Sequence, residues 1–340
     1  MNYPKFLPAN GTIGFVAPSF GCNIEPYQSA FRNALRKLEK SGYQIKLGPN
    51  VYKGDGIGIS TNPKDCAGEL TGAYEDAVSD CLISCGGGEL MCEVLDHLDL
   101  ERIKHAEPKW YMGYSDNTNF VFLQATVNDT AAVYGPCAPA FGMEPWHESL
   151  EDALAVLSGR KRILHGYTLY EKESLKDEEH PLLPYNVTEA VVRKVFPNRD
   201  TKIEGRLIGG CMDCLVTLLG TGYDKVKEFA QNYKEDGILW FLEACDLNPM
   251  SMRRAMWQMK AAGWFEYVKG FLIGRPYHHG ETEFGLDQYH AILDIVEDLQ
   301  VPVLMDLDIG HIPPMMPLVV GSYTRVTTKG NEIELEMEFI

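Results

Sequence analysis

Short apolar runs alternate with amphipathic segments of helical period through the first 140 residues of the chain. This alternation predicts a parallel β-sheet covered by helices, because neighbouring parallel strands need a crossover connection. The expected strands are Thr12 to Ala17, Tyr43 to Leu47, Cys81 to Ser84, Trp110 to Gly113 and Ala131 to Tyr134. The expected helices are Pro26 to Lys40, Pro63 to Ala77, Glu89 to Leu98 and Asn117 to Val127. Ligands of such a sheet gather at the carboxyl ends of its strands, so functional residues are expected there.

A second α/β unit is expected after a looser middle segment. At 340 residues the chain exceeds the size at which one hydrophobic core keeps growing. The middle segment is rich in proline and carries a charged run from Glu171 to His180, which indicates a linker and loop region. The predicted division is an N-terminal domain at residues 1–140, a linker and loop region at 141–204, and a C-terminal domain at 205–340.

The C-terminal unit has its own strand and helix patterns. Its expected strands are Ile238 to Leu242, Gly270 to Ile273 and Val301 to Met305, and its expected helices are Met250 to Ala262 and Leu286 to Leu299. The tail from Val319 to Ile340 alternates in polarity and turns at Lys329 to Asn331, which predicts a terminal β-hairpin. The predicted fold class is therefore α/β, with a parallel-sheet domain followed by a second α/β domain.

The charge of the chain restricts its partners. Its 31 basic and 48 acidic residues give a net charge of −17, which repels phosphate backbones and anionic membrane surfaces. The N-terminus lacks the pattern of a secretion signal, and no apolar stretch approaches the length needed to span a bilayer. Nine scattered cysteines, an odd number, fit a reducing compartment better than a disulfide framework. We expect a cytoplasmic protein without a nucleic-acid or membrane partner.

Two cysteine spacings raise the question of a metal site. They are Cys211-Met-Asp-Cys214 and the pair Cys81 and Cys85. A structural zinc site normally takes two close pairs, or one pair and regularly spaced histidines, and the sequence offers neither pattern. Buried thiols packed as small apolar groups are the favoured interpretation, so no metal is expected.

Three short segments end on side chains of catalytic type. Gly-Tyr-Ser-Asp contains Ser115, Trp-Phe-Leu-Glu ends on Glu243, and Gly-His-Ile-Pro contains His311. A serine hydroxyl becomes a good nucleophile when an imidazole takes its proton and a carboxylate orients the imidazole. Each segment also has an ordinary alternative: Ser115 or Asp116 can cap a helix, Glu243 can end a strand, and His311 can be an exposed loop residue.

A glycine turn follows the expected strand that ends at Ser84. Gly86, Gly87 and Gly88 let backbone N–H groups approach an anion closely, so the turn can bind a carboxylate or an oxyanion. The spacing is neither a dinucleotide fingerprint nor a phosphate loop. A tight turn without a ligand remains the alternative.

The chain resembles the LD-carboxypeptidases, a family of serine peptidases that also includes the microcin C immunity proteins. The shared motifs, which occur in the same order along nearly the whole chain, are Gly11-Thr-Ile-Gly-Phe-Val-Ala-Pro-Ser, Ser84-Cys-Gly-Gly-Gly-Glu, Gly113-Tyr-Ser-Asp, Tyr134-Gly-Pro, Gly205-Arg-Leu-Ile-Gly-Gly-Cys, Leu219-Gly-Thr, the Glu243 strand and Gly310-His311. The resemblance implies a Rossmann-like N-terminal domain, no metal or organic cofactor, and a homodimer.

The resemblance also implies roles for individual residues. Ser115 is the expected nucleophile, His311 the general base and Glu243 the carboxylate that orients the base. The backbone N–H groups of Gly87 and Asp116 are expected to form the oxyanion hole. Gly88 and Glu89, which follow in the same turn, are expected to contact the substrate.

Two substrate classes fit the family. LD-carboxypeptidases release a terminal D-residue from an L-D bond of murein tetrapeptides, whereas the immunity branch cleaves peptidyl or aminoacyl adenylate analogues. The pattern Gly87 to Glu89 and the long segment Gly142 to Glu204 favour the immunity branch. However, that segment has no tryptophan after Trp146 to stack on a nucleobase, and Tyr185 or Phe196 would have to replace it.

An alternative of another class is a catalytically inactive protein that binds a peptide or a sugar in the same cleft. The presence of a serine, a glutamate and a histidine in the family positions argues against it. Glutamine-amidotransferase chemistry is disfavoured, because it would require a cysteine at position 115.

Overall fold

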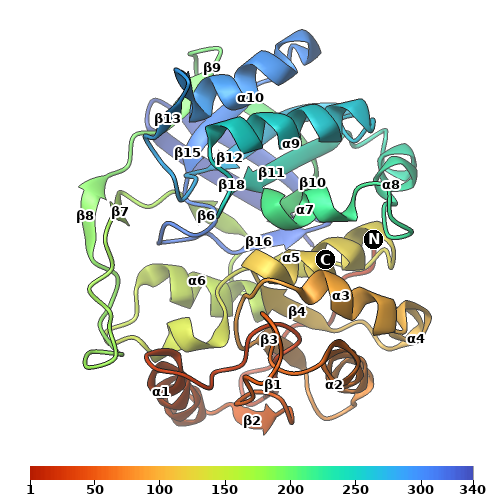
Figure 1. Cartoon of the computed structure of the whole chain (residues 1–340), viewed down its shortest axis with the longest axis vertical. Coiled ribbons are helices and arrows are strands. Elements are labelled where there is room, and N and C mark those ends of the chain that lie inside the picture. The colour runs from red at the N-terminus through yellow and green to blue at the C-terminus, as the bar shows by residue number, and fades with distance from the viewer. Residues whose placement is uncertain (340) are drawn as a thin grey trace.

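Two β-sheets, each with helices packed on it, lie one above the other in the molecule (Figure 1). The computed structural model describes residues 1–339, and Ile340 lies outside the described residues. The first sheet has six strands in the order β16-β5-β4-β3-β1-β2. Their bounds are β1 Thr12–Val16, β2 Gln44–Leu47, β3 Cys81–Ser84, β4 Trp110–Gly113, β5 Ala132–Tyr134 and β16 Leu318–Val320. Strands β1 to β5 pair in parallel, as the alternation of strands and helices predicted.

The helices that follow these strands are close to those expected from the sequence. They are α1 Tyr27–Lys40, α2 Pro63–Glu75, α3 Met91–Val94, α4 Leu100–His105, α5 Thr118–Thr126 and α6 Glu148–Leu157. The predicted helix Glu89 to Leu98 is shorter than expected. The Glu89 N–H donates to the Gly58 carbonyl instead of entering a helix, and Asp99 caps a separate helix by accepting from the Arg102 N–H.

The second sheet has eight strands in the order β6-β18-β17-β10-β11-β12-β15-β9. Their bounds are β6 Ile163–His165, β9 Lys194–Phe196, β10 Lys202–Cys211, β11 Ile238–Glu243, β12 Val268–Gly274, β15 Val303–Leu307, β17 Tyr323–Lys329 and β18 Glu332–Glu338. The central strands β10, β11, β12 and β15 are parallel, and β17 pairs with β18 as the predicted hairpin. The helices of this part are α7 Met212–Leu218, α8 Val226–Asn232, α9 Pro249–Ala261 and α10 Gln288–Val296. The predicted α/β class is therefore confirmed.

The middle segment contains more regular structure than its composition indicated. Helix α6 and strands β6 and β9 belong to it, and β7 Leu169–Glu171 pairs with β8 Val187–Ala190 in an arm that projects at the left of Figure 1. A further two-stranded hairpin, β13 Thr282–Glu283 and β14 Leu286–Asp287, precedes α10. Strands of two to four residues at sheet edges do not need the apolar runs by which buried strands are recognised. The division of the chain into three regions stays a prediction.

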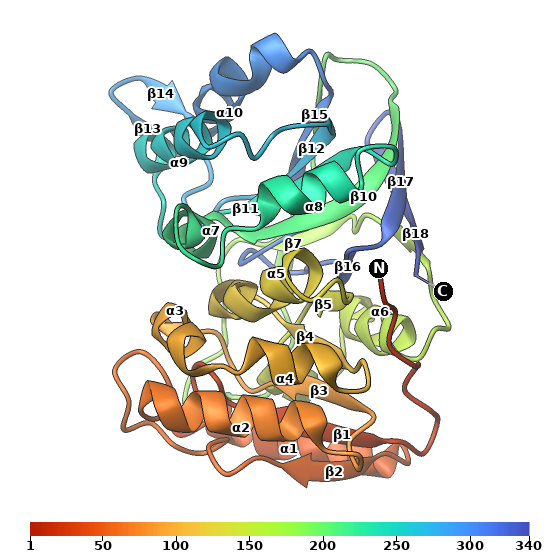
Figure 2. The same cartoon turned by 90° about the vertical axis from the view of Figure 1, so that its right-hand side faces the viewer.

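Helix α5 joins the two halves of the molecule, between which it lies in Figure 2. Its Phe122 ring lies 6.1 Å from the Trp240 ring of β11 and 5.7 Å from the Trp264 ring, measured between centroids. At the start of the helix, the Thr118 hydroxyl accepts a hydrogen bond of 3.0 Å from the Cys211 N–H at the end of β10. Aromatic packing and this bond hold the carboxyl ends of β4 and β10 close together.

After β15 the chain crosses from the second sheet to the first sheet and then returns. Residues 308–317 leave the second sheet, β16 adds an antiparallel strand to β5 of the first sheet, and β17 returns to the second sheet. The segment that carries His311 is thus anchored in both sheets. None of the helices in residues 1–339 is long and apolar enough to cross a membrane.

Candidate active site

Ser115 lies at a sharp turn where the first sheet faces the second. It follows β4 and begins the 3₁₀ turn Ser115–Asn117, which leads directly into α5. Its φ of 62° is in the left-handed region, which non-glycine residues rarely occupy. A buried strand, a strained turn and a buried helix hold the half-buried hydroxyl above the sheet edge, as in a nucleophile elbow. The strand and helix expected around Ser115 are therefore both present.

Glu243 and His311 come from the second half of the chain and meet Ser115 at this edge. Glu243 ends β11 and is only 1% exposed, and His311 follows β15. The His311 Nε2 atom lies 2.9 Å from the Ser115 hydroxyl, and the Nδ1 atom lies 2.9 Å from the Glu243 carboxylate. The structure thus brings together three side chains that are far apart in the sequence. Such a chain of hydrogen bonds can move a proton from the serine to the imidazole.

Gly310 allows the loop that carries His311 to approach Glu243 closely. Its φ of 98° is left-handed, and a Cβ atom at this position would lie 2.6 Å from the Glu243 Oε2 atom. A side chain on residue 310 would therefore displace either the carboxylate or the loop that carries His311. The glycine before His311 is part of the geometry and not only a turn residue.

A buried network centred on Asp308 fixes the other end of this loop. The Asp308 carboxylate accepts hydrogen bonds of 2.6 Å from Arg275, 2.5 Å from Arg193 and 3.0 Å from the Tyr167 N–H. Asp308 has no exposed surface, and its carbonyl accepts a bond of 2.8 Å from the Met316 N–H across the loop. The network positions His311 through the backbone and does not contact it directly.

Tyr134 links the nucleophile turn to the carboxylate, a role that was not expected from the sequence. It lies at the end of β5, has no exposed surface, and donates a hydrogen bond of 2.5 Å to the Glu243 Oε1 atom. Its oxygen also accepts a bond of 3.2 Å from the Ser115 N–H. Burial and the nearby Glu243 charge raise the pKa of Tyr134, so the phenol stays protonated and donates. The Tyr134-Gly-Pro motif was the only sign of it in the sequence.

The charges of Glu243 and His311 stabilise each other. Burial raises the pKa of Glu243, but the His311 charge and the hydrogen bonds from His311 and Tyr134 prevail and leave it below its usual value. Burial lowers the pKa of His311, but the Glu243 carboxylate prevails and holds it well above its usual value. The carboxylate is therefore ionised and makes the imidazole a stronger base, as proton removal from Ser115 requires.

The glycine turn lies directly against the serine. A Cβ atom on Gly87 would be 2.8 Å from the Ser115 Cβ atom and 3.9 Å from the Asp116 backbone nitrogen. The Asp116 carboxylate accepts hydrogen bonds from Ser19, the Met91 N–H and Asn119. Burial outweighs these bonds and raises the pKa of Asp116 to about 6. The Asp116 carboxylate is thus held by hydrogen bonds, and the Asp116 backbone nitrogen lies beside Gly87 and the nucleophile.

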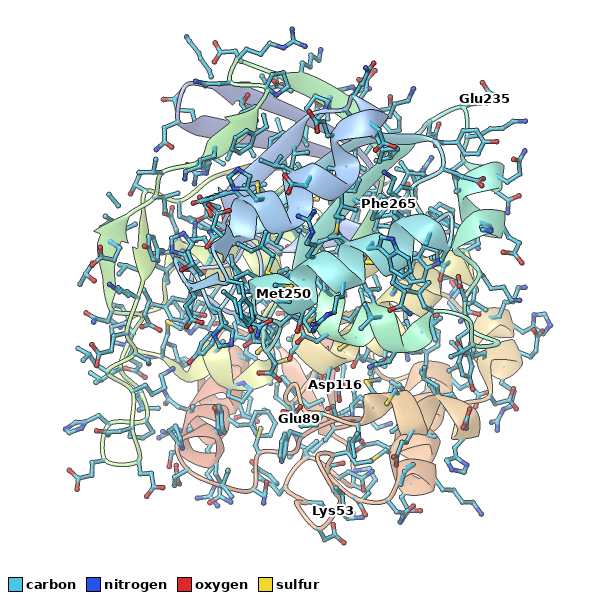
Figure 3. All side chains as sticks on the ribbon, turned by 45° about the horizontal axis from the view of Figure 1, so that its top comes forward. Lys53, Glu89, Asp116, Glu235, Met250 and Phe265 are labelled. Carbon is cyan, nitrogen blue, oxygen red and sulfur yellow. The ribbon has the colours of Figure 1, made fainter. Side chains whose placement is uncertain are left out.

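Gly88 and Glu89 line a cavity of about 200 Å³ that opens on Ser115. Figure 3 shows Glu89 and Asp116 close together, where the N-terminal half meets the C-terminal half. The lining includes four carboxyl groups and four thiols but no lysine or arginine: Glu89, Asp116, Asp213, Asp246, Cys92, Cys211, Cys214 and Cys245. The cavity therefore has an acidic, thiol-rich wall next to the serine.

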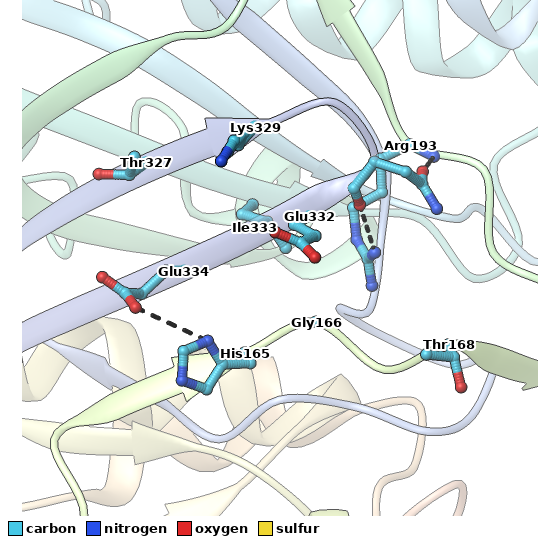
Figure 4. Close-up of a pocket in the computed structure, with 10 residues that line it drawn as sticks. His165, Gly166, Thr168, Arg193, Thr327, Lys329, Glu332, Ile333 and Glu334 are labelled. Carbon is cyan, nitrogen blue, oxygen red and sulfur yellow. Dashed lines mark hydrogen bonds and ion pairs between the residues drawn. The ribbon is translucent and has the colours of Figure 1, made fainter.

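A larger cavity of about 540 Å³ lies away from these residues (Figure 4). It is bounded by β6, β17, β18 and Arg193, and it contains none of the three predicted catalytic side chains. Its His165 and Glu334 pair with each other at 3.7 Å, and Arg193 is engaged by Asp308. Size alone does not make it the reaction site, since it brings no nucleophile and base together.

Comparison with known proteins identifies the family. Residues 13–135 match the model of the LD-carboxypeptidase N-terminal domain, and residues 204–326 match the model of the LD-carboxypeptidase C-terminal domain. The chain belongs to the LD-carboxypeptidase family. This LD-carboxypeptidase homologue is a hydrolase of the serine carboxypeptidase type, and the resemblance seen in its motifs is confirmed.

Relatives of the LD-carboxypeptidase family match over almost the whole chain. The microcin C7 self-immunity protein MccF of Escherichia coli is 24% identical over 98% of this chain and 95% of its own length. A probable murein peptide carboxypeptidase of Bacillus subtilis (strain 168) is 25% identical over 96% of this chain and 92% of its own length. The solved structure of MccF in complex with aspartyl sulfamoyl adenosine has a TM-score of 0.84 at 21% identity and covers 100% of both chains.

Proposed function

We propose that the chain hydrolyses an amide near the C-terminus of a small peptide through an acyl-serine intermediate. Ser115 is the nucleophile, His311 the general base and Glu243 the carboxylate that orients it. The proposal depends above all on the two distances of 2.9 Å that connect Ser115 to His311 and His311 to Glu243. Both are hydrogen-bond distances, and together they supply every part that an activated serine requires.

The reaction follows from these positions. His311 takes the Ser115 proton as the oxygen attacks the carbonyl carbon, and the resulting oxyanion is stabilised by the N–H groups of Gly87 and Asp116. His311 then gives the proton to the leaving amine, and the C–N bond breaks. A water molecule, activated by the same imidazole, releases the acyl group from Ser115. Each N–H donor of this kind contributes about 10²- to 10³-fold to kcat in serine hydrolases.

The first candidate substrate is a murein tetrapeptide cleaved at its L-D bond, which would give the enzyme a role in cell-wall recycling. The similarity to the probable murein peptide carboxypeptidase of Bacillus subtilis supports this choice. The cavity beside Ser115 adds a charge requirement: Glu89 and Asp246 are exposed carboxylates there, and no cation lines the wall. We infer that the substrate part bound in this cavity carries a free ammonium group and not a carboxylate.

The second candidate is hydrolysis of a peptidyl or aminoacyl adenylate analogue, as in microcin C immunity. The match to MccF along almost the full length of both chains favours it. Tyr185 is the stacking candidate of the long segment: it is half-buried, and its ring lies 5.7 Å from the His147 ring, measured between centroids. Phe196 is excluded from this role, because it pairs with Val303 at the end of β15 that is remote from His311.

Parallel assays separate the two candidates. The protein is incubated with an L-D murein tetrapeptide and with an aminoacyl sulfamoyl-adenosine, and products are identified by mass spectrometry, with Ser115→Ala as the control. Release of D-alanine from the tetrapeptide alone supports the first candidate, and cleavage of the nucleoside conjugate alone supports the second. Binding of either compound without any cleavage would favour the inactive binding protein instead.

We further propose that the enzyme acts in the cytoplasm as a homodimer, without nucleic-acid or membrane partners. All nine cysteines are free thiols, as a reducing compartment requires, and the net charge of −17 disfavours polyanions. Light scattering of the purified protein tests the dimer, and a mass of one chain at micromolar concentration would contradict it.

A further inference from the structure

Three thiols surround the proposed catalytic residues. Cys211 ends β10, is buried, and its Sγ atom lies 3.2 Å from the Asp213 carboxylate. The Cys214 Sγ atom lies 3.6 Å from the Ser115 carbonyl oxygen, and Cys245 follows Glu243 by two residues and lines the same cavity as Ser115. Amide hydrolysis by a serine uses none of these thiols. Their concentration around one small cavity therefore calls for another explanation.

Cys211, Glu243 and His311 together form a set of metal ligands. One ligand atom of each, the Cys211 Sγ, a Glu243 carboxylate oxygen and a His311 ring nitrogen, lies within 4.8 Å of the others. Thiolate, carboxylate and imidazole are the groups that bind Zn²⁺, and zinc sites with three protein ligands keep a fourth position for water. In the sequence, Cys211 and Cys214 have no second ligand pair at the spacing of a structural zinc site. The fold supplies the missing ligands from β11 and from the loop after β15.

We propose that this cluster binds one Zn²⁺ ion, or a divalent ion of similar softness, and that the bound ion inhibits hydrolysis. Binding releases the Cys211 thiol proton, so one thiolate and one carboxylate balance the two charges of the ion. The ion either binds the His311 nitrogen or draws the imidazole ring away from Ser115. In both cases the serine loses its general base. The acidic wall of the cavity, with Glu89 and Asp246 exposed, attracts the cation to the site.

The inhibitory part of this inference rests on the proposed function, but metal binding itself does not. Binding is therefore measured without a substrate. Reduced, metal-free protein is titrated with Co²⁺, which serves as a spectroscopic probe for Zn²⁺, and the thiolate-to-cobalt charge-transfer absorption is followed. We expect one equivalent of Co²⁺, an absorption that Zn²⁺ abolishes by displacement, and the same binding in Ser115→Ala.

Two cysteine variants form a matched pair. Cys211→Ser removes the soft ligand and should lose the charge-transfer band and bind at least about tenfold more weakly, since loss of even an outer-shell partner costs 10- to 100-fold. Cys92→Ser changes another thiol of the same cavity that lies outside the cluster, and it should bind like the parent. His311→Ala removes a second ligand and covers the case in which Cys211→Ser does not fold.

The outcomes separate the site from the proposed function. Zn²⁺ should inhibit the parent enzyme, and a chelator should restore its activity. A parent protein that hydrolyses its substrate but shows no thiolate-to-cobalt band would overturn the metal site and leave the function intact. The site would also be refuted by equal Co²⁺ affinity in the parent, Cys211→Ser and His311→Ala. Metal binding by a protein that cleaves neither substrate would instead refute the function alone.

Discussion

Replacing Tyr134 with phenylalanine tests whether the link between Ser115 and Glu243 contributes to catalysis. The change removes one oxygen, and the ring keeps its place 5.3 Å from the Phe241 ring. The lost oxygen donates at 2.5 Å to Glu243 and accepts at 3.2 Å from the Ser115 N–H. The two partners lie at the ends of β4 and β11, and in the variant neither keeps this hydrogen bond.

The size of the effect follows from the charge of Glu243. A hydrogen bond to a charged group contributes about 1.5–3 kcal/mol, and its loss here weakens the carboxylate that stabilises the imidazolium of the transition state. Because each 1.36 kcal/mol is a factor of ten, we expect kcat/KM to fall by about 10- to 150-fold. KM should change little, since Tyr134 has no exposed surface and does not line the cavity next to Ser115.

The assay is steady-state hydrolysis of whichever substrate the parent enzyme cleaves, with urea unfolding measured in parallel. Tyr74→Phe is the matched control, because Tyr74 is equally buried and its oxygen accepts from the Lys109 N–H at 3.3 Å, far from Glu243. We expect this control to lose stability but to keep its kcat/KM. A Tyr134→Phe enzyme with kcat/KM within twofold of the parent would refute the reasoning.

Four further predictions concern the same site and the network that supports it. Gly87→Ala places a Cβ atom 2.8 Å from the Ser115 Cβ and should lower kcat by about 10²- to 10³-fold in a rate assay while the melting temperature stays near that of the parent. The raised pKa of His311 means that kcat/KM should increase with pH through a midpoint above 6.5, because only the neutral imidazole accepts the serine proton. In Glu243→Gln the rate should fall by up to about 10⁴-fold and the midpoint should move to lower pH, since burial lowers the pKa of His311 and the carboxylate that opposes it is gone. Asp308→Asn leaves two buried arginines without their carboxylate and should cost about 3–5 kcal/mol in urea unfolding; an unchanged midpoint would contradict that estimate.

The sequence predicted the central strands β3, β4 and β5 of the first sheet well because they are buried on both faces. The expected strands at Cys81 to Ser84 and Trp110 to Gly113 agree with β3 and β4 at both ends. The edge strands β6, β7, β8 and β9 were missed, because three or four half-exposed residues carry too little hydrophobic pattern. Strand β16, which crosses back to the first sheet, was also missed, since no local pattern encodes which sheet a strand joins.

The residues of the candidate site also differ in how strongly the sequence points to them. Ser115, Glu243 and His311 could be named as candidates because they lie in recognisable strand-turn motifs and because the motifs match a family. Tyr134 and Cys211 could not be named in this way. The Glu243 partner of Tyr134 is 109 residues away, and the neighbours of Cys211 lie on β11 and in the loop after β15. Contacts of this kind depend on how two sheets meet, and a single sequence records neither sheet order nor interdomain distance.

The most direct test of the central claim is detection of an acyl group on Ser115. Substrate and enzyme are mixed, quenched in acid within the first turnover and digested, and the peptide that contains residue 115 is examined by mass spectrometry. The proposed mechanism predicts the mass of the acyl part on Ser115 and no such adduct in Ser115→Ala. Turnover by Ser115→Ala at the parent rate, or an acyl group on another residue, would contradict it.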